Sequence, residues 1–242
     1  ASLGLMALLL HSFVDFNLQI PANAILAISL MALLSSHLRF ATERFWVSAK
    51  LGRKALATVV LLAGLVYLSG QGWRRAQEYV WLRRAAKTPI YSRAQIAALE
   101  RAFAVEPGNF ETTYVIGEAY RVQSWEGNDD YVELAQKAMQ WYERGTKLNP
   151  YDPNNYLRHG MCLDWIGHQS ESGPYYDRAD QLDPNGYFTA ANIGWHYVQL
   201  GNYAAAKPWF ERSQHLQWTD NRIADSYLAL VQRKMREAAA GH

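Results

Sequence analysis

Among its 242 residues the sequence holds a single cysteine, Cys162. One thiol cannot form an internal disulfide, and it cannot supply a cysteine-based metal site. The seven histidines are scattered, and no two of them stand at the helical spacing of paired metal ligands. The sequence therefore predicts no metal ion and no cofactor.

Charge is also scarce in the first 71 residues, which contain only seven charged side chains. From Arg74 onward charged residues are frequent and nearly balanced in sign. The formal net charge of the whole chain is only +2, too small to indicate nucleic acid as a partner. We therefore expect two physically different parts joined end to end.

The first part, residues 1–73, contains two uncharged runs, at 16–38 and 55–73. Each has about the length needed to cross a bilayer, and Trp73 ends the second run, where an indole favours the interface. Because Pro21 and Asn23 would start the first helix, we expect membrane spans at about 23–38 and 55–73, with lipid as a partner. The alternative is a buried hairpin of a soluble protein.

The short loop between these runs, residues 39–54, predicts their orientation. It contains five basic residues and one acidic residue, which favours the cytoplasmic side. Residues 11–23 and everything after Trp73 would then be extracytoplasmic. The basic residues at 74, 75, 83 and 84 favour the opposite orientation, but we give the short loop more weight.

The second part repeats itself every 34 residues. Leucines, aromatic rings, small residues, glycines and prolines recur at this spacing, as Leu148, Leu182 and Leu216; Tyr142, Tyr176 and Phe210; Ala138, Ser172 and Ala206; Gly160 and Gly194; and Pro150 and Pro184. Such a period is typical of helix-turn-helix repeats, whose stacked units bury a core that no single unit could bury. The prolines would end each second helix.

The stretch 192–216, NIGWHYVQLGNYAAAKPWFERSQHL, resembles a tetratricopeptide (TPR) repeat. The matching positions are Gly194, Tyr197, Gly201, Tyr203, Ala206 and Phe210. Residues 114–122 resemble a first helix of this type, and an insertion after them stretches that repeat to 43 residues. Residues 97–109 resemble the second helix of a degenerate repeat.

We therefore expect an all-α chain in three parts. These are transmembrane helices within 1–73, a linker helix at 74–93, and a TPR-like helical-hairpin solenoid at 94–242. A terminal capping helix would begin near Asn221.

The TPR resemblance implies that a peptide or protein binds to the concave face made by the first helices. The positions that correspond to this face are Glu111, Tyr114, Glu118, Arg121, Asn154, Leu157, Met161, Trp165, Phe188 and Trp195. Their aromatic content suits a peptide or sugar rings. The alternative is that several of them only pack against neighbouring helices, as aromatic residues usually do.

A polar passage, HSFVDFNLQIPAN at 11–23, lies between two apolar stretches. It resembles a late segment of the O-antigen ligase and polymerase family of the bacterial inner membrane, some of whose members carry a TPR tail. The resemblance implies metal-independent transfer of an undecaprenyl-diphosphate-linked glycan at the extracytoplasmic face. Asp15 would orient an acceptor hydroxyl or hold a catalytic arginine, and His11 would support it by hydrogen bonding. The structural alternative is that both residues only cap helix ends.

Two functions are compatible with these patterns. The chain could be the C-terminal part of a glycan ligase or polymerase that is inactive alone, because the main catalytic loop of that family lies upstream. It could instead be a membrane-anchored TPR adaptor without a catalytic role. The sequence does not identify the glycan, the acceptor or the TPR ligand.

Overall fold

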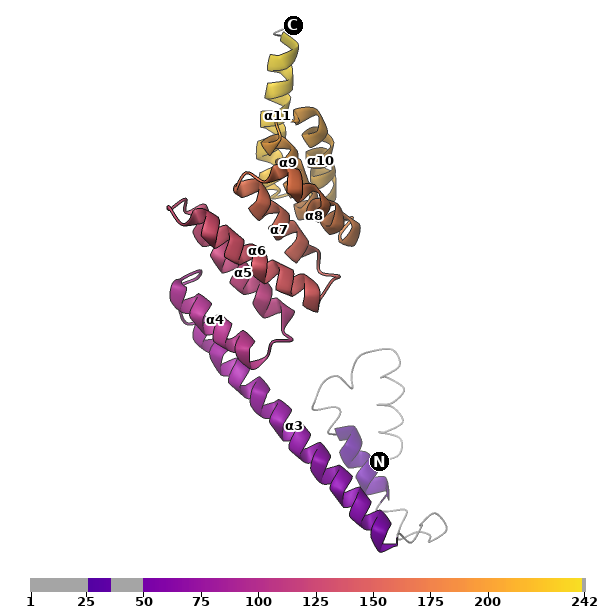
Figure 1. Cartoon of the computed structure of the whole chain (residues 1–242). Helices are drawn as coiled ribbons and strands as arrows, with labels where there is room; N and C mark the ends of the chain where they lie inside the picture. Colours follow the sequence, from indigo (N-terminus) through magenta and orange to yellow (C-terminus); the bar gives the residue numbers. More distant parts are fainter. Residues whose placement is uncertain (1–25, 36–49, 241–242) are drawn as a thin grey trace. The chain divides into compact units, whose positions relative to one another are not determined.

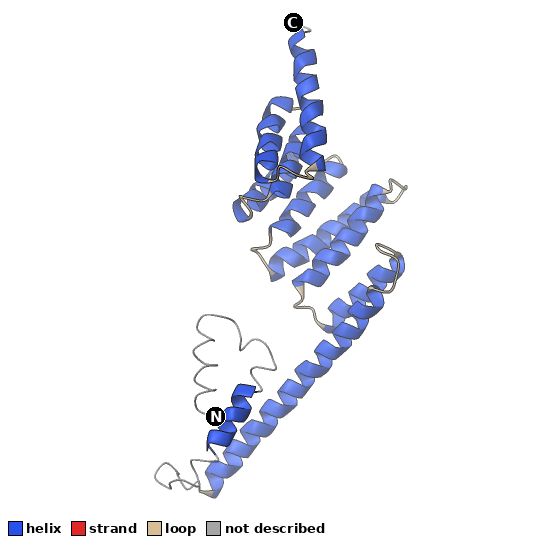
Figure 2. Ribbon diagram, turned by 180° about the vertical axis from the view of Figure 1, so that it is seen from behind, coloured by secondary structure: helices blue, strands red, loops and turns tan. Residues whose placement is uncertain are grey.

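The computed structural model describes residues 26–35 and 50–240, and within them all regular secondary structure is α-helical (Figures 1 and 2). The chain divides into two units, Ala1–Val66 and Tyr67–His242. The all-α prediction is confirmed for the described residues.

The apolar segment forms one long helix, α3 (Leu51–Ala85), preceded by a short apolar helix at Leu26–Ser35. Within the described ranges α3 is the one helix long and apolar enough to cross a membrane, with a mean hydropathy of 1.6 over its most apolar stretch. It contains the expected span at 55–73. The expected span at 23–38 extends beyond the described residues, so a second membrane-crossing helix is not confirmed.

The second unit begins within α3, at Tyr67, and continues with a series of shorter helices. These are α4 (Arg93–Val105), α5 (Phe110–Trp125), α6 (Tyr131–Leu148), α7 (Pro153–Trp165), α8 (Gln169–Leu182), α9 (Tyr187–Gln199), α10 (Tyr203–Leu216) and α11 (Arg222–Ala240). Helices α5 and α6, α7 and α8, and α9 and α10 pack as pairs that follow one another along the chain (Figure 1). This arrangement is the predicted solenoid of helical hairpins.

The sequence marks where these helices begin and end. Side chains that accept a backbone N–H cap α4, α5, α7 and α10, namely Ser92, Asn109, Asp152 and Asn202. Helices α6 and α8 end two residues before Pro150 and Pro184, as predicted. Gly167 and Gly201 have φ angles of +85° and +69° in the turns after α7 and α9, a conformation that favours glycine.

The core of each hairpin is a glycine on the first helix facing an aromatic ring on the second. The contacts are Gly117 with Tyr142, Gly160 with Tyr176, and Gly194 with Phe210. All three rings are almost fully buried. A Cβ added at Gly194 would lie 2.9 Å from ring carbons of Phe210, so the absence of a side chain allows the helices to approach this closely.

The first helices of the hairpins line one face of the stack. Helix α5 contacts α7, α7 contacts α9, and α9 contacts α11, whereas α6, α8 and α10 do not contact one another in this described unit. Helices that touch lie on the inner side of a curved stack. The inner face is therefore built from α5, α7, α9 and α11.

Candidate functional site

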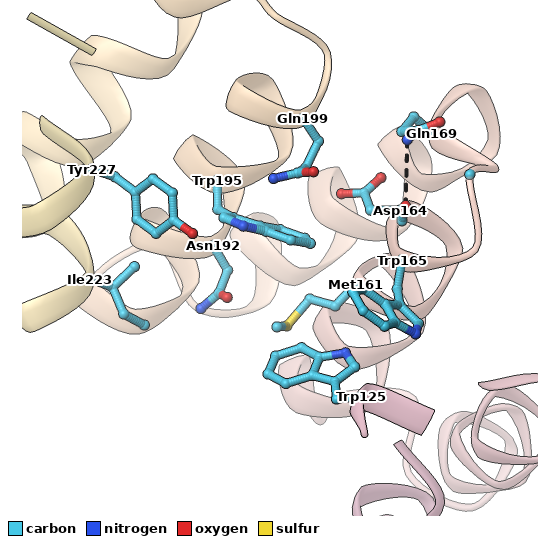
Figure 3. Close-up of a pocket in the computed structure, with 11 residues that line it drawn as sticks. Trp125, Met161, Asp164, Trp165, Gln169, Asn192, Trp195, Gln199, Ile223 and Tyr227 are labelled. Carbon is cyan, nitrogen blue, oxygen red and sulfur yellow. Dashed lines mark hydrogen bonds between the residues drawn. The ribbon is translucent and has the colours of Figure 1, made fainter. Parts of the chain in front are cut away.

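A groove of about 650 Å³ opens on this inner face (Figure 3). It is lined by Trp125, Met161, Asp164, Trp165, Gly167, Gln169, Asn192, Trp195, Gln199, Ile223 and Tyr227. The residues come from α5, α7, α9 and α11, together with the turn after α7 and the start of α8. Its volume is within the range of roughly 300–1,000 Å³ typical of ligand sites.

Two tryptophans near one end of the groove form an aromatic cluster. The ring centroids of Trp125 and Trp165 lie 6.2 Å apart, and Tyr131 packs edge-on against Trp165 at 6.1 Å. The Trp165 indole N–H donates to Ser124 Oγ at 3.0 Å, which fixes the orientation of that ring. Trp125 remains 43% exposed, so its ring is available for contact.

Polar groups in the groove are mostly uncharged amides. The Asn192 Nδ2 donates to the Phe188 carbonyl at 2.8 Å, and Gln169 Nε2 donates to the Asp164 carbonyl at 3.4 Å. The Gln199 amide and the Tyr227 hydroxyl have no hydrogen-bond partner among the described residues. The same is true of the Trp195 indole N–H. These three groups are free to bond a ligand.

Below the groove, the carboxylate of Asp164 on α7 is fully buried and binds three side chains from two other helices, α8 and α9. Ser172 Oγ donates to it at 2.6 Å, the Tyr176 hydroxyl donates at 2.8 Å, and His196 Nδ1 lies 3.0 Å from both of its oxygens. Burial and the neighbouring Asp164 charge raise the pKa of Tyr176 well above 10, so it stays a neutral donor. Because Ser172 is fully buried and donates to the acid, this serine, histidine and aspartate set joins α7, α8 and α9 and presents no nucleophile.

A buried ionic cluster lies beside Trp125. Glu118 accepts hydrogen bonds from Arg121 at 2.8 and 2.9 Å and from the Tyr142 hydroxyl at 2.5 Å, while Arg158 Nε lies 3.1 Å away. Burial alone would raise the pKa of Glu118, but the Arg121 hydrogen bond and the charges of Arg158 and Arg121 outweigh it, so the pKa lies below its ordinary value. The cluster holds two cations and one anion, and Arg121 Nη1 has no acceptor in the described structure.

The structure places the ten predicted concave-face residues in three settings. Met161, Trp165 and Trp195 line the groove. Five others are buried or half-buried: Glu118, Arg121, Tyr114, Leu157 and Phe188. Glu118 and Arg121 belong to the ionic cluster, and Leu157 belongs to the hydrophobic core. Glu111 and Asn154 are exposed in the first turns of α5 and α7, away from the groove lining. Binding by all ten stays a prediction.

Sequence reasoning missed several residues that line the groove, above all Trp125, Gln199 and Tyr227. Trp125 belongs to the segment interpreted as an insertion, although it forms the last residue of α5. Tyr227 lies on α11, which the sequence indicated only as a cap. For Trp125 and Tyr227 the available signal was an aromatic residue near the end of a recognised first helix or on the terminal helix, whereas Gln199 gave no such signal.

His11 and Asp15 lie outside the described residues, so their predicted catalytic role stays a prediction. Within the part of the chain that is described, no group of three or more histidine, cysteine or acidic side chains is placed to hold a metal ion.

Comparison with known proteins agrees with the repeat architecture. The tetratricopeptide repeat family matches residues 189–217, which include all of α10 and all but the first two residues of α9. A search of curated proteins finds no match. The crystal structure of a thermophilic TPR protein from Thermus thermophilus is similar with a TM-score of 0.55 and 14% identity, covering 69% of this chain and 94% of that one.

The crystal structure of MamA protein is similar with a TM-score of 0.51 and 14% identity, covering 67% of this chain and 90% of that one. At such identity the likeness establishes the fold, a TPR-type helical solenoid. The TPR part of the predicted resemblance is therefore confirmed, whereas the family match does not extend to residues 1–73.

Proposed function

We propose that this protein is a TPR scaffold that binds a segment of a partner protein in the aromatic groove and is held at a membrane by α3. The observation that carries the proposal is the groove itself, which four successive inner-face helices line with three tryptophans and a tyrosine. Partly exposed aromatic side chains bury a large area at small entropic cost, and they dominate the binding energy of protein interfaces. This is the adaptor function that the sequence also allowed.

Peptide display on the purified full chain tests the groove. Random dodecapeptides selected for binding to the wild type should bind the variant Trp195→Ala with lower affinity. Trp218→Ala is the matched control, because Trp218 is 88% exposed and lies outside the groove lining. Selected peptides that bind both variants as they bind the wild type would contradict the proposal.

Membrane anchoring is supported by the apolar side chains of α3, whose most apolar stretch has none of its residues buried. The basic loop at 39–54 further favours an extracytoplasmic location for the repeats. A reporter active only in the cytoplasm, fused after His242, should give no signal. A strong signal would reverse the proposed topology.

A second candidate is that the chain forms the C-terminal part of an O-antigen ligase or polymerase of the bacterial inner membrane. The polar passage at 11–23 favours it, through its resemblance to that family. Asp15→Asn in the longer parent protein should then abolish transfer of the lipid-linked glycan while leaving the protein level unchanged. Asn23→Ala is the control in the same passage, and equal activity of wild type and Asp15→Asn would leave the scaffold as the remaining proposal.

A further inference from the structure

Charge is unevenly distributed along the helical unit. Residues 74–101, which include the end of α3 and most of α4, contain seven basic and two acidic residues. Residues 102–242 contain twelve basic and eighteen acidic residues. The segment that directly follows the apolar stretch of α3 is therefore positively charged, whereas the rest of the solenoid is negatively charged.

Most of the basic side chains in residues 74–101 have no acidic partner. Arg74 lies 3.4 Å from Glu106, and Arg75 lies 3.3 Å from Glu78. The other five form no ion pair with any residue in the described part of the chain: Arg83, Arg84, Lys87, Arg93 and Arg101. Ion pairs within the described chain thus neutralise only two of the seven cations.

Two of the unpaired arginines meet at one aromatic ring. The guanidinium carbon of Arg84 lies 4.5 Å from the centre of the Trp81 ring, and that of Arg101 on α4 lies 4.8 Å from the same centre. Cation–π attraction to Trp81 therefore brings two like charges from different helices together. Both arginines are exposed, and a guanidinium pairs well with phosphate oxygens.

The face of α3 that carries Arg84 is mainly apolar. A hollow of about 300 Å³ on this face is lined by Trp73, Ala76, Gln77, Val80, Trp81 and Arg84, whose spacing is that of one side of a helix. Trp73 is 67% exposed and Val80 is 48% exposed. The ten residues from Trp73 to Arg83 rise about 15 Å, roughly the depth of a lipid head-group layer plus one Debye length.

We propose that the basic surface formed by Trp73, Trp81, Arg83, Arg84, Lys87 and Arg101 binds the anionic head groups of phospholipids. This inference rests on the proposed anchoring of α3 in a membrane, which places a bilayer surface directly beside these residues. Indole rings favour the interface, and each basic residue near an anionic surface strengthens binding to it. The negatively charged remainder of the solenoid is repelled by the same surface, which keeps the groove away from the bilayer.

The test is native mass spectrometry of the full chain in detergent, given equimolar phosphatidylglycerol and phosphatidylcholine. We expect the wild type to retain phosphatidylglycerol preferentially. The triple variant Arg83→Gln, Arg84→Gln, Arg101→Gln should lower this preference about fivefold or more, because each basic residue near an anionic surface contributes about that factor. The matched control Arg233→Gln, Lys234→Gln, Arg236→Gln removes the same charge from the surface of α11 and should keep the preference.

Two further variants separate charge from folding. Arg84→Lys with Arg101→Lys keeps both charges and should keep the preference. Arg83→Gln with Lys87→Gln leaves the contacts to Trp81 intact and should lower it, so the test does not depend on the fold of the triple variant, which circular dichroism checks. The loop at 39–54 is also basic, so the decisive comparison is between the two triple variants.

Equal lipid preference in the two triple variants would overturn the inference. Displacement of bound phosphatidylglycerol by an equal concentration of decaglutamate would also overturn it and indicate an acidic protein as the partner of this surface. If the chain resists carbonate extraction from phosphatidylcholine vesicles but shows no arginine-dependent preference, this inference fails and the anchoring stands. If carbonate releases the chain from these vesicles, both fail.

Discussion

At the scale of single residues, the same contact between a glycine and an aromatic ring recurs in three successive hairpins. A Cβ added at Gly117, Gly160 or Gly194 would lie 2.6, 3.1 or 2.9 Å from the ring of Tyr142, Tyr176 or Phe210, respectively. The 34-residue spacing of the aromatic positions and of Gly160 and Gly194 therefore follows from the close packing of the two helices in each hairpin. Two buried polar clusters, an ionic one around Glu118 and a hydrogen-bonded one around Asp164, join neighbouring helices.

Replacing Gly194 with leucine should destabilise the solenoid by about 1–3 kcal/mol or more, because the new side chain overpacks against Phe210. Thermal unfolding of the full chain measures this. Gly173→Leu is the matched control, since Gly173 also lies in a helix but has no atom within 4 Å of an added Cβ. Equal melting temperatures for the two variants would contradict the assigned packing.

Glu118→Gln should cost about 3–5 kcal/mol of stability, because it leaves Arg121 and Arg158 buried without a negative charge. The free energy of unfolding in urea measures the loss. In the control, Glu133→Gln, the lost ion pair with Lys137 is exposed, and its effect should be much smaller. If Glu118→Gln were as stable as the control, the cluster would contribute little.

His159 should make stability depend on pH. Burial lowers the pKa of His159 from 6.5 to about 4, and the nearby Glu143 charge only partly opposes this shift. The unfolded chain therefore binds the proton more readily, so the stability contributed by neutral His159 is complete above pH 6.5 and declines as the pH falls toward about 4.

Urea unfolding across this pH window, compared between wild type and His159→Gln, isolates the contribution of His159. The variant should lose less stability on acidification than the wild type. Parallel curves for the two proteins would show that His159 does not titrate as described.

At the scale of helices, α11 closes the core and forms one wall of the groove. Ala224, Leu228 and Val231 pack against Phe210, while Ile223 and Tyr227 line the groove. The terminal helix is therefore part of the candidate site and not only a cap.

Deleting residues 222–242 should lower the melting temperature and increase the fluorescence of 8-anilinonaphthalene sulfonate, because the apolar face of α10 becomes exposed. The deletion should also abolish peptide binding. Its control is deletion of residues 241–242 alone, and an unchanged melting temperature after the longer deletion would contradict the role assigned to α11.

The helices were more predictable from the sequence than the groove. The 34-residue period and the prolines are local signals, and they predicted the hairpins and the ends of α6 and α8. The groove forms where α5, α7, α9 and α11 meet. Two of its lining residues, Trp125 and Tyr227, lie outside the segments that the sequence identified as repeats. The partners of Asp164 are likewise set by tertiary packing, which the sequence period does not encode.

At the scale of the whole molecule, one chain combines an apolar helix with a stack of helical hairpins that carries the groove. The proposed anchoring depends on the apolar side chains of α3, and the proposed peptide binding depends on the groove lined by α5, α7, α9 and α11. The scaffold proposal requires both, and the groove is its central claim.

Fluorine NMR of the full chain labelled with 5-fluorotryptophan tests that claim most directly. The nine tryptophan signals are assigned by single substitutions and followed while a display-selected dodecapeptide is added. The account predicts that the signals of Trp125, Trp165 and Trp195 shift with saturation, while that of Trp218 does not. Shifts confined to tryptophans outside the groove, or no shift at saturating peptide, would contradict it.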